Sequence, residues 1–261
     1  MIRCGIGGWT FEEWRGTFYP DDLPAKRELE YASRKLTTIE INGTFYRTQT
    51  PASFKKWFDE TPDDFVFSVK APRYIVGKKV LADSGALIDV FLKSGLVELR
   101  QKLGPILWQL APYKKFDDDI AAFLKMLPGE YGGVALRHTL EIRSKSFLVP
   151  EFVDMARKAN VAIVYADSDD YPPIADVTAD FSYARLQRCV ENETTGYSAK
   201  ALDQWVAHAR EWEKGIAPGA LETYGKPSKP EKKKHDVFLY FISGAKVRAP
   251  QAAMAMIERL K

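Results

Sequence analysis

The chain has 261 residues, of which 46% are hydrophobic and 28% are charged, a balance typical of soluble globular proteins. No apolar run approaches the roughly 20 residues that a membrane-spanning helix needs, so the composition argues against an integral membrane protein. The first residues lead directly into a strand-like segment without a signal peptide, and Cys4 and Cys189 lie far apart in the sequence. We therefore expect a cytoplasmic protein with reduced thiols.

The formal net charge of +3 is concentrated in one short segment. Residues 226–236 contain five lysines against Glu231 and Asp236, which accounts for the whole net charge and leaves the rest of the chain neutral. A nucleic-acid-binding protein usually spreads its basic residues over a face. We interpret residues 226–236 as a basic surface loop inside a single domain that spans residues 1–261.

Strand-like and helix-like segments alternate along the whole chain. The strand predictions rest on short apolar or β-branched runs, and they cover residues 2–6, 37–42, 65–70, 106–110, part of 134–143, 161–166, 181–186 and 237–242. The helix predictions rest on helical spacing and on start signals at Pro24, Pro51 and Ser198. They cover residues 23–36, 51–60, 116–127, 150–159, 198–214, 249–260 and most of 81–103, with interruptions at Gly85 and Gly95.

These alternating segments form about eight strand–helix units, which indicates parallel strands joined by helical crossovers. A closed eight-stranded barrel typically has about 250 residues, close to the length of this chain. The predicted fold class is therefore α/β, a single-domain TIM-type (β/α)8 barrel. An open doubly wound sheet is the alternative.

The second predicted strand carries polar residues where an apolar core is expected. Glu40 and Asn42 share one face of this strand, while Ile39 and Ile41 share the other. A carboxylate and an amide on one face favour contact with water or a ligand. In a parallel barrel all strand ends gather at one mouth. Other polar residues late in strands are Ser68, Lys70, Gln109, Glu141, Arg143, Asp167, Arg185, Gln187 and Tyr240.

We interpret this set as a site at the mouth of the barrel, with a structural layer of mutually satisfied charges as the alternative. Lys70, Arg143 and Arg185 are expected to hold an anionic group, such as a phosphate or a carboxylate. Glu40 and Glu141 are candidates for acid/base catalysis, and Asp167 joins them as a third carboxylate. The remaining expected ligand contacts are Trp9, Asn42, Tyr46, Gln109 and Tyr240, with the aromatic rings placed to stack on a sugar or base.

The pattern predicts an enzyme acting on a small anionic, sugar-like substrate, and isomerase, lyase and hydrolase chemistry are all open. No cofactor is implied, although magnesium or manganese on Glu40, Glu141 and Asp167 is an alternative. The three histidines lack the spacing of a metal cluster.

Two other functions compete with this prediction: a barrel that binds or cleaves nucleic acid with help from Lys226–Lys234, and a non-catalytic binding protein. The sequence leaves the oligomeric state open.

Several motifs resemble the family called domain of unknown function 72, the YecE-like proteins. The most specific is Glu40-Ile41-Asn42-Gly43-Thr44-Phe45-Tyr46-Arg47. Weaker matches follow in the family's order from the first strand to the last helix. They include Gly5–Trp9, Phe18–Pro20, Phe65–Lys70, Gly104–Leu110, Glu141–Arg143 and Tyr183–Leu186.

The resemblance implies a TIM-type barrel and places family-typical polar positions at most of the residues named above, but it implies no settled activity. The chain departs from the family pattern at two places. Many relatives carry histidine after the arginine that corresponds to Arg143, where this chain has Ser144. Many also carry His-Gly after Arg-Leu, where this chain has Gln187-Arg188. A mechanism that uses imidazole at either place is therefore in doubt.

Overall fold

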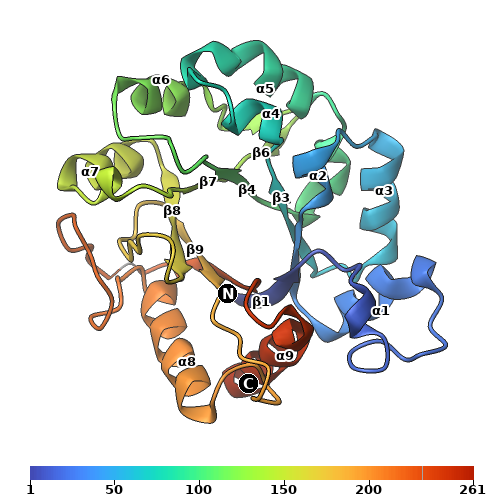
Figure 1. Cartoon of the computed structure of the whole chain (residues 1–261). Helices are drawn as coiled ribbons and strands as arrows, with labels where there is room; N and C mark the ends of the chain where they lie inside the picture. The colour runs from blue at the N-terminus through green and yellow to red at the C-terminus, as the bar shows by residue number, and fades with distance from the viewer. Residues whose placement is uncertain (231) are drawn as a thin grey trace.

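The computed structural model describes residues 1–230 and 232–261 and forms a closed barrel of eight parallel strands. The strands follow one another around the barrel in the order β1-β10-β9-β8-β7-β4-β3-β2, so the last strand closes on the first (Figure 1). The predicted single-domain TIM-type barrel is confirmed. Its strands are β1 (Ile2–Gly7), β2 (Thr38–Ile41), β3 (Val66–Lys70), β4 (Leu103–Gln109), β7 (His138–Glu141), β8 (Val161–Asp167), β9 (Phe181–Leu186) and β10 (Asp236–Phe241).

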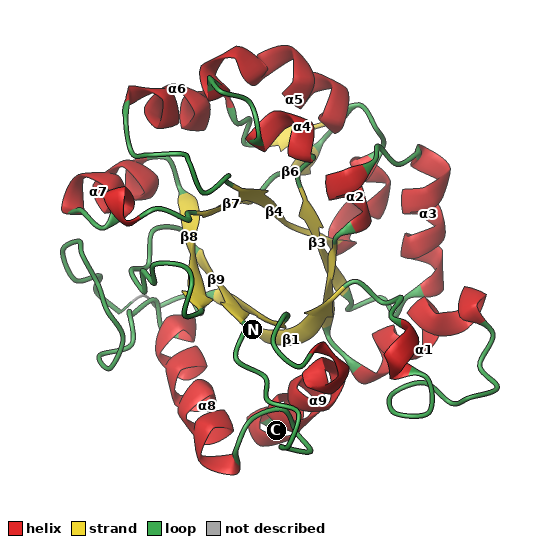
Figure 2. Cartoon of the chain, viewed as in Figure 1, coloured by secondary structure: helices red, strands yellow, loops and turns green. Residues whose placement is uncertain are grey.

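The longer helices form a ring around the strands (Figure 2). Several begin at side-chain caps: the Oγ1 of Thr50 accepts from the backbone N–H of Ser53 at 3.2 Å, and the Oγ of Ser198 accepts from that of Ala201 at 3.2 Å. The ring contains α1 (Glu28–Lys35), α3 (Pro51–Glu60), α5 (Gly85–Leu92), α6 (Asp118–Met126), α7 (Pro150–Lys158), α8 (Ala199–Glu213) and α9 (Ala249–Leu260).

Strand side chains alternate between the barrel interior and the surrounding helices, as the two-residue period of a strand requires. The inward residues form three levels. Apolar side chains such as Phe181 and Phe238 pack together near the N-terminal ends of the strands. Hydroxyl groups follow: Thr38 bonds to Tyr240 at 2.8 Å. Charged side chains occupy the C-terminal ends, so the mouth is the polar end of the core.

The structure differs from the predicted elements mainly in the connections. The two short strands β5 (Glu130–Tyr131) and β6 (Val134–Ala135) pair antiparallel before β7, whereas one strand was expected within 134–143. The expected helix over 81–103 is interrupted at Gly85 and Gly95 as predicted, but only α5 between them is α-helical, because Leu81–Ser84 and Leu96–Lys102 form 3-10 turns. At Gly95 the backbone has a φ of 102°, which ends the first part of this region.

Two single-turn helices, α2 (Gly43–Tyr46) and α4 (Arg73–Val76), follow β2 and β3 directly at the mouth, where no helix was predicted. The expected helix over 23–36 is α-helical only from Glu28, after a 3-10 turn at Ala25–Arg27. Within the described ranges, no helix is long and apolar enough to cross a membrane.

The predicted basic loop joins α8 to the start of β10. It therefore lies at the N-terminal ends of the strands, opposite the mouth. Glu231 falls outside the described residues. The lysines of this segment are exposed; they are Lys226, Lys229, Lys232, Lys233 and Lys234.

Candidate functional site

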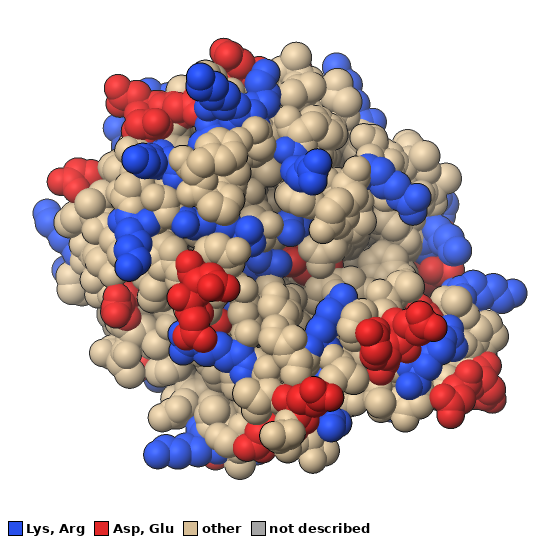
Figure 3. Space-filling view, viewed as in Figure 1, with Lys and Arg blue, Asp and Glu red and all other residues tan. Residues whose placement is uncertain are grey.

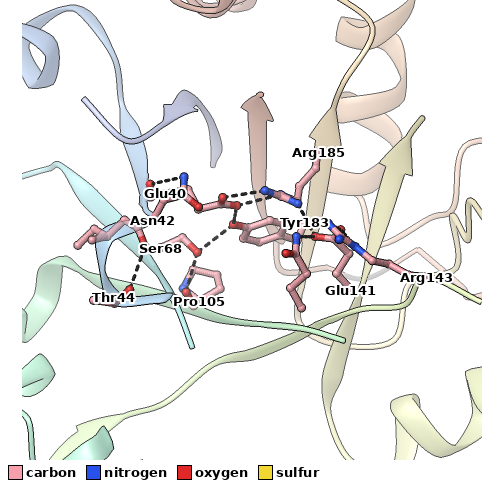
Figure 4. Close-up of polar contacts among 11 residues, drawn as sticks. Glu40, Asn42, Thr44, Ser68, Pro105, Glu141, Arg143, Tyr183 and Arg185 are labelled. Carbon is pink, nitrogen blue, oxygen red and sulfur yellow. Dashed lines mark hydrogen bonds and ion pairs between the residues drawn. The ribbon is translucent and has the colours of Figure 1, made fainter. Parts of the chain in front are cut away.

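The inward-facing charges at the strand ends form one buried network. Glu40 ends the inner face of β2, Glu141 that of β7 and Arg185 that of β9, and their side chains point toward one another (Figure 4). The strands run parallel, so residues about 140 positions apart in sequence meet at one level of the barrel. Glu40 and Arg185, for example, are separated by 145 positions.

Arg185 lies between the two glutamates. Its Nε and Nη2 donate to Oε2 and Oε1 of Glu40 at 3.1 and 3.0 Å, and its Nη1 donates to Oε2 of Glu141. Burial opposes the positive charge of Arg185, but the two carboxylates outweigh burial and raise its pKa. The guanidinium therefore stays charged and fixes the positions of both carboxylates through paired hydrogen bonds.

All four carboxylate oxygens of the two fully buried glutamates have partners. The hydroxyl of Tyr183 also donates to Oε2 of Glu40 at 2.7 Å. Arg143 donates from Nε and Nη2 to Oε1 of Glu141 at 3.1 and 3.0 Å, and Gln109 donates to Oε2 at 2.9 Å. Burial works to raise the pKa of Glu141, but the neighbouring guanidinium groups lower it overall. Glu141 is therefore held as an ionised acceptor.

Lys70 ends the inner face of β3 beside this network, and it has no anionic partner. Its side chain is largely buried, and its Nζ lies 4.2 Å from the centre of the Phe45 ring. Within the described chain, no carboxylate oxygen lies within 4.0 Å of this nitrogen. Burial, and next the charge of Arg185, lower the pKa of Lys70 to about 8. Lys70 is thus a buried amine whose pKa lies well below that of a surface lysine.

An open pocket of about 480 Å³ adjoins the network at the ends of β1 and β2. A smaller hollow of about 180 Å³ shares Gly7, Asn42 and Lys246 with it and reaches Arg185. A Cβ at position 7 would lie 2.8 Å from the Asn42 amide nitrogen, so glycine keeps this floor open. Figure 3 shows a hollow near the middle of this face, with Lys and Arg side chains around it. The lining also includes Trp9, Thr10, Tyr46, Arg47, Gln49 and Trp57.

Three of the residues predicted to contact a ligand therefore line the pocket and are not part of the charged network. Trp9 lies on its wall, and Tyr46, with 76% of its surface exposed, lies on its rim. Asn42 was expected to continue the face of Glu40. Instead, β2 ends at Ile41 and Asn42 adopts a helical φ of −86° at the start of α2, with its amide still facing the pocket.

Two predicted site residues lie elsewhere. Asp167 was expected to share a cavity with Glu40 and Glu141, but residues of odd number in β8 face the helices. Its oxygens lie 3.4 Å from Arg188 and 3.5 Å from Tyr197. The three carboxylates therefore do not form one set of metal ligands. In the part of the chain that the structure describes, no group of three or more His, Cys, Asp or Glu residues is arranged to hold a metal.

Tyr240 faces the interior as expected, but it lies one level below the charges. It is fully buried and bonded to Thr38, so it supports the network instead of reaching a ligand. Several residues of the site, among them Tyr183, Trp57 and Lys246, were not among the predicted site residues. Tyr183 was recognisable, because it precedes Arg185 by two positions on the same face. Trp57 and Lys246 were not, because a helix surface and a three-residue 3-10 turn carry no pattern that points to the pocket.

Comparison with known proteins identifies the family. A model described as "Protein of unknown function DUF72" matches residues 3–261. The chain belongs to the DUF72 family. The UPF0759 protein YunF of Bacillus subtilis (strain 168) is 28% identical over 159 residues, which are 59% of this chain and 55% of YunF. The UPF0759 protein YecE of Escherichia coli (strain K12) is 29% identical over 142 residues, or 53% of this chain and 49% of YecE.

The aligned part of the chain spans about half the length of these curated relatives. Solved structures of family members share the fold over the whole chain. A DUF72 family protein from Thermotoga maritima has a TM-score of 0.74 with 22% identity, covering 100% of this chain and 99% of its own. One from Enterococcus faecalis has a TM-score of 0.71 with 16% identity, covering 100% and 97%. At 22% and 16% identity, these likenesses show the fold alone.

Proposed function

We propose that this DUF72 protein is an enzyme that acts on a small anionic, sugar-like compound at the C-terminal mouth of its barrel. One observation carries the proposal: three cationic side chains meet only two carboxylates at the mouth, and two of these cations, Lys70 and Arg185, are buried. The carboxylates are fully engaged with Arg185 and Arg143, so the excess charge lies at Lys70. A buried cation without an internal counterion favours an anionic ligand.

The lining of the adjoining pocket matches the other half of such a ligand. Trp9, Tyr46 and Trp57 offer aromatic surface, which packs well on the apolar face of a sugar ring. Arg47 and Lys246 supply positive charge, while the lining contains no Asp or Glu. The amide of Asn42 offers both a donor and acceptor for hydroxyl groups. The pocket therefore suits a hydroxylated compound that carries phosphate or carboxylate.

The roles within the network follow from its contacts. We assign Glu40 and Glu141 to positioning Arg185 and Arg143, because both carboxylates are buried and lack a free oxygen. A general acid or base works best when its pKa lies near the pH at which the enzyme operates. Lys70, with a pKa of about 8, is therefore the group suited to proton transfer. These roles are compatible with isomerase, lyase and hydrolase chemistry.

Ligand binding tests the proposal. We expect glucose 6-phosphate, ribose 5-phosphate or gluconate to raise the unfolding temperature by about 5–10 °C at roughly 100 times the Kd, measured by scanning fluorimetry. Glucose and ribose, which lack the anionic group, are the matched ligands and should have little effect. Equal shifts with neutral and anionic sugars, or none with any of them, would contradict the proposal.

A pair of lysine variants locates the binding site. Lys246→Gln removes a charge from the pocket and should weaken the binding of the best sugar phosphate about tenfold in calorimetry, equivalent to about 1.4 kcal/mol. Lys158→Gln is the control, because Lys158 is exposed at the end of α7, at the opposite end of the barrel. Equal weakening in both variants would place the binding outside the pocket.

A further inference from the structure

Three lysines are almost completely buried, and Lys70 differs from the other two. The exposed fractions are 7% for Lys70, 1% for Lys102 and 5% for Lys114. Lys102 donates to two backbone carbonyl oxygens at 2.7 Å each. Lys114 donates to a carbonyl oxygen at 2.6 Å and to Asp119 at 3.1 Å. Lys102 and Lys114 are therefore structural, whereas no hydrogen bond or ion pair of Lys70 occurs in the described chain.

The charges that face Lys70 explain why its amine remains unpartnered. Arg185 and Arg143 disfavour its positive charge, while Glu40 and Glu141 favour it. The four carboxylate oxygens are already held by guanidinium, amide and hydroxyl donors. Lys70 is therefore surrounded by satisfied charges at the end of a strand, where TIM barrels hold their reacting groups.

We propose that Lys70 is a nucleophile that condenses with the carbonyl carbon of an anionic aldehyde or oxo acid to form an imine. This inference rests on the proposed function, because the same site must first hold the anionic substrate. Phe45, which lies on the single-turn helix α2, covers the amine: the centre of its ring is 4.2 Å from Nζ. A ligand that displaces this ring gains direct access to Nζ.

The proposed step needs no further reactant. The neutral Nζ attacks the carbonyl carbon, and the carbon–oxygen π bond opens to give a carbinolamine. The carbonyl oxygen then leaves as water with the two amine hydrogens, and a carbon–nitrogen double bond remains. Because burial lowers the pKa of Lys70 to about 8, half of it is neutral at pH 8. This fraction is about a hundredfold larger than that of a surface lysine with a pKa of about 10.4.

Reductive trapping tests the proposal on the whole protein. The protein is incubated with pyruvate or glyceraldehyde 3-phosphate in the presence of cyanoborohydride, and the modified peptides are mapped by mass spectrometry. We expect the secondary-amine adduct at Lys70 in preference to every surface lysine. Labelling should fall by about tenfold or more from pH 8 to pH 6, as the neutral amine disappears. Labels spread over surface lysines, with Lys70 unmodified, would overturn the proposal.

Matched variants separate nucleophilic from electrostatic roles. Lys70→Arg keeps the positive charge and should abolish the adduct while retaining sugar phosphate binding. Lys102→Arg is the control at a buried structural lysine and should keep the adduct at Lys70. The peptide map of the unaltered protein decides the matter even if a variant fails to fold. An unlabelled Lys70 in a protein that binds sugar phosphates refutes the nucleophile alone; absence of both labelling and binding refutes the proposed function as well.

Discussion

At the scale of single residues, the ion pair of Glu40 with Arg185 should contribute more to stability than any surface pair. Glu40→Gln leaves Arg185 buried with one of its two counterions missing, so we expect a loss of roughly 3 kcal/mol in the free energy of unfolding, measured with urea. Glu258→Gln breaks the exposed pair with Lys261 and should cost below about 1 kcal/mol. Similar small losses in both variants would return Glu40 to the candidates for proton transfer.

The same scale shows what strand patterns reveal about a site. Glu40, Lys70, Gln109, Glu141 and Arg185 could be predicted to converge, because each is the last inward residue of a parallel strand. Asp167 was misplaced for a physical reason: β8 is buried on both faces, so its apolar run shows no alternation from which the inward positions can be read. The unpartnered state of Lys70 depends on hydrogen bonds between distant strands, which no local pattern encodes.

At the scale of elements, the start of α3 packs closely against Gly95, and a methyl group added at position 95 should disrupt this contact. Gly95 has a φ of 102°, and a Cβ there would lie 2.5 Å from the Cα of Pro51, the first residue of α3. Gly95→Ala should therefore cost roughly 2–4 kcal/mol, through backbone strain and overpacking. α3 carries Trp57 of the pocket wall, so sugar phosphate binding should weaken as well.

Differential scanning calorimetry measures this loss as a lower unfolding temperature. Gly129→Ala is the matched control, because no atom lies within 4 Å of its added Cβ, and it should change stability by less than about 0.5 kcal/mol. An unfolding temperature for Gly95→Ala equal to that of the control would show that the turn before Leu96–Lys102 adapts without strain.

The strands were predictable as elements because each is a compact apolar run between breakers. The mouth elements were not. α2 and α4 have four residues each, too few to display a helical period of 3.6 residues. The strands β5 and β6 have two residues each, and in the sequence they cannot be told apart from the nearby β7. The connections that shape the pocket are thus the part of the fold with the weakest sequence signal.

At the scale of the whole molecule, the barrel separates two groups of positive charge. The guanidinium groups of Arg143 and Arg185 at the mouth are engaged with glutamates. The exposed lysines of residues 226–236 lie at the opposite ends of the strands. A nucleic-acid strand would have to pass around the barrel to meet both groups. This separation favours a small ligand over nucleic acid. The separation itself could be predicted from the sequence, because a barrel places strand starts and strand ends at opposite ends.

The separation predicts that the two groups act independently. β10 has six residues and is about 20 Å long, twice the Debye length of about 10 Å at 0.1 M salt. Replacing Lys229, Lys232 and Lys233 together with Gln should therefore leave the calorimetric Kd for sugar phosphate within about twofold of the unaltered protein. Lys246→Gln, in the pocket, provides the contrast. If the triple variant weakens binding as much as Lys246→Gln does, the anion is held at the lysine segment, and the mouth is not the site.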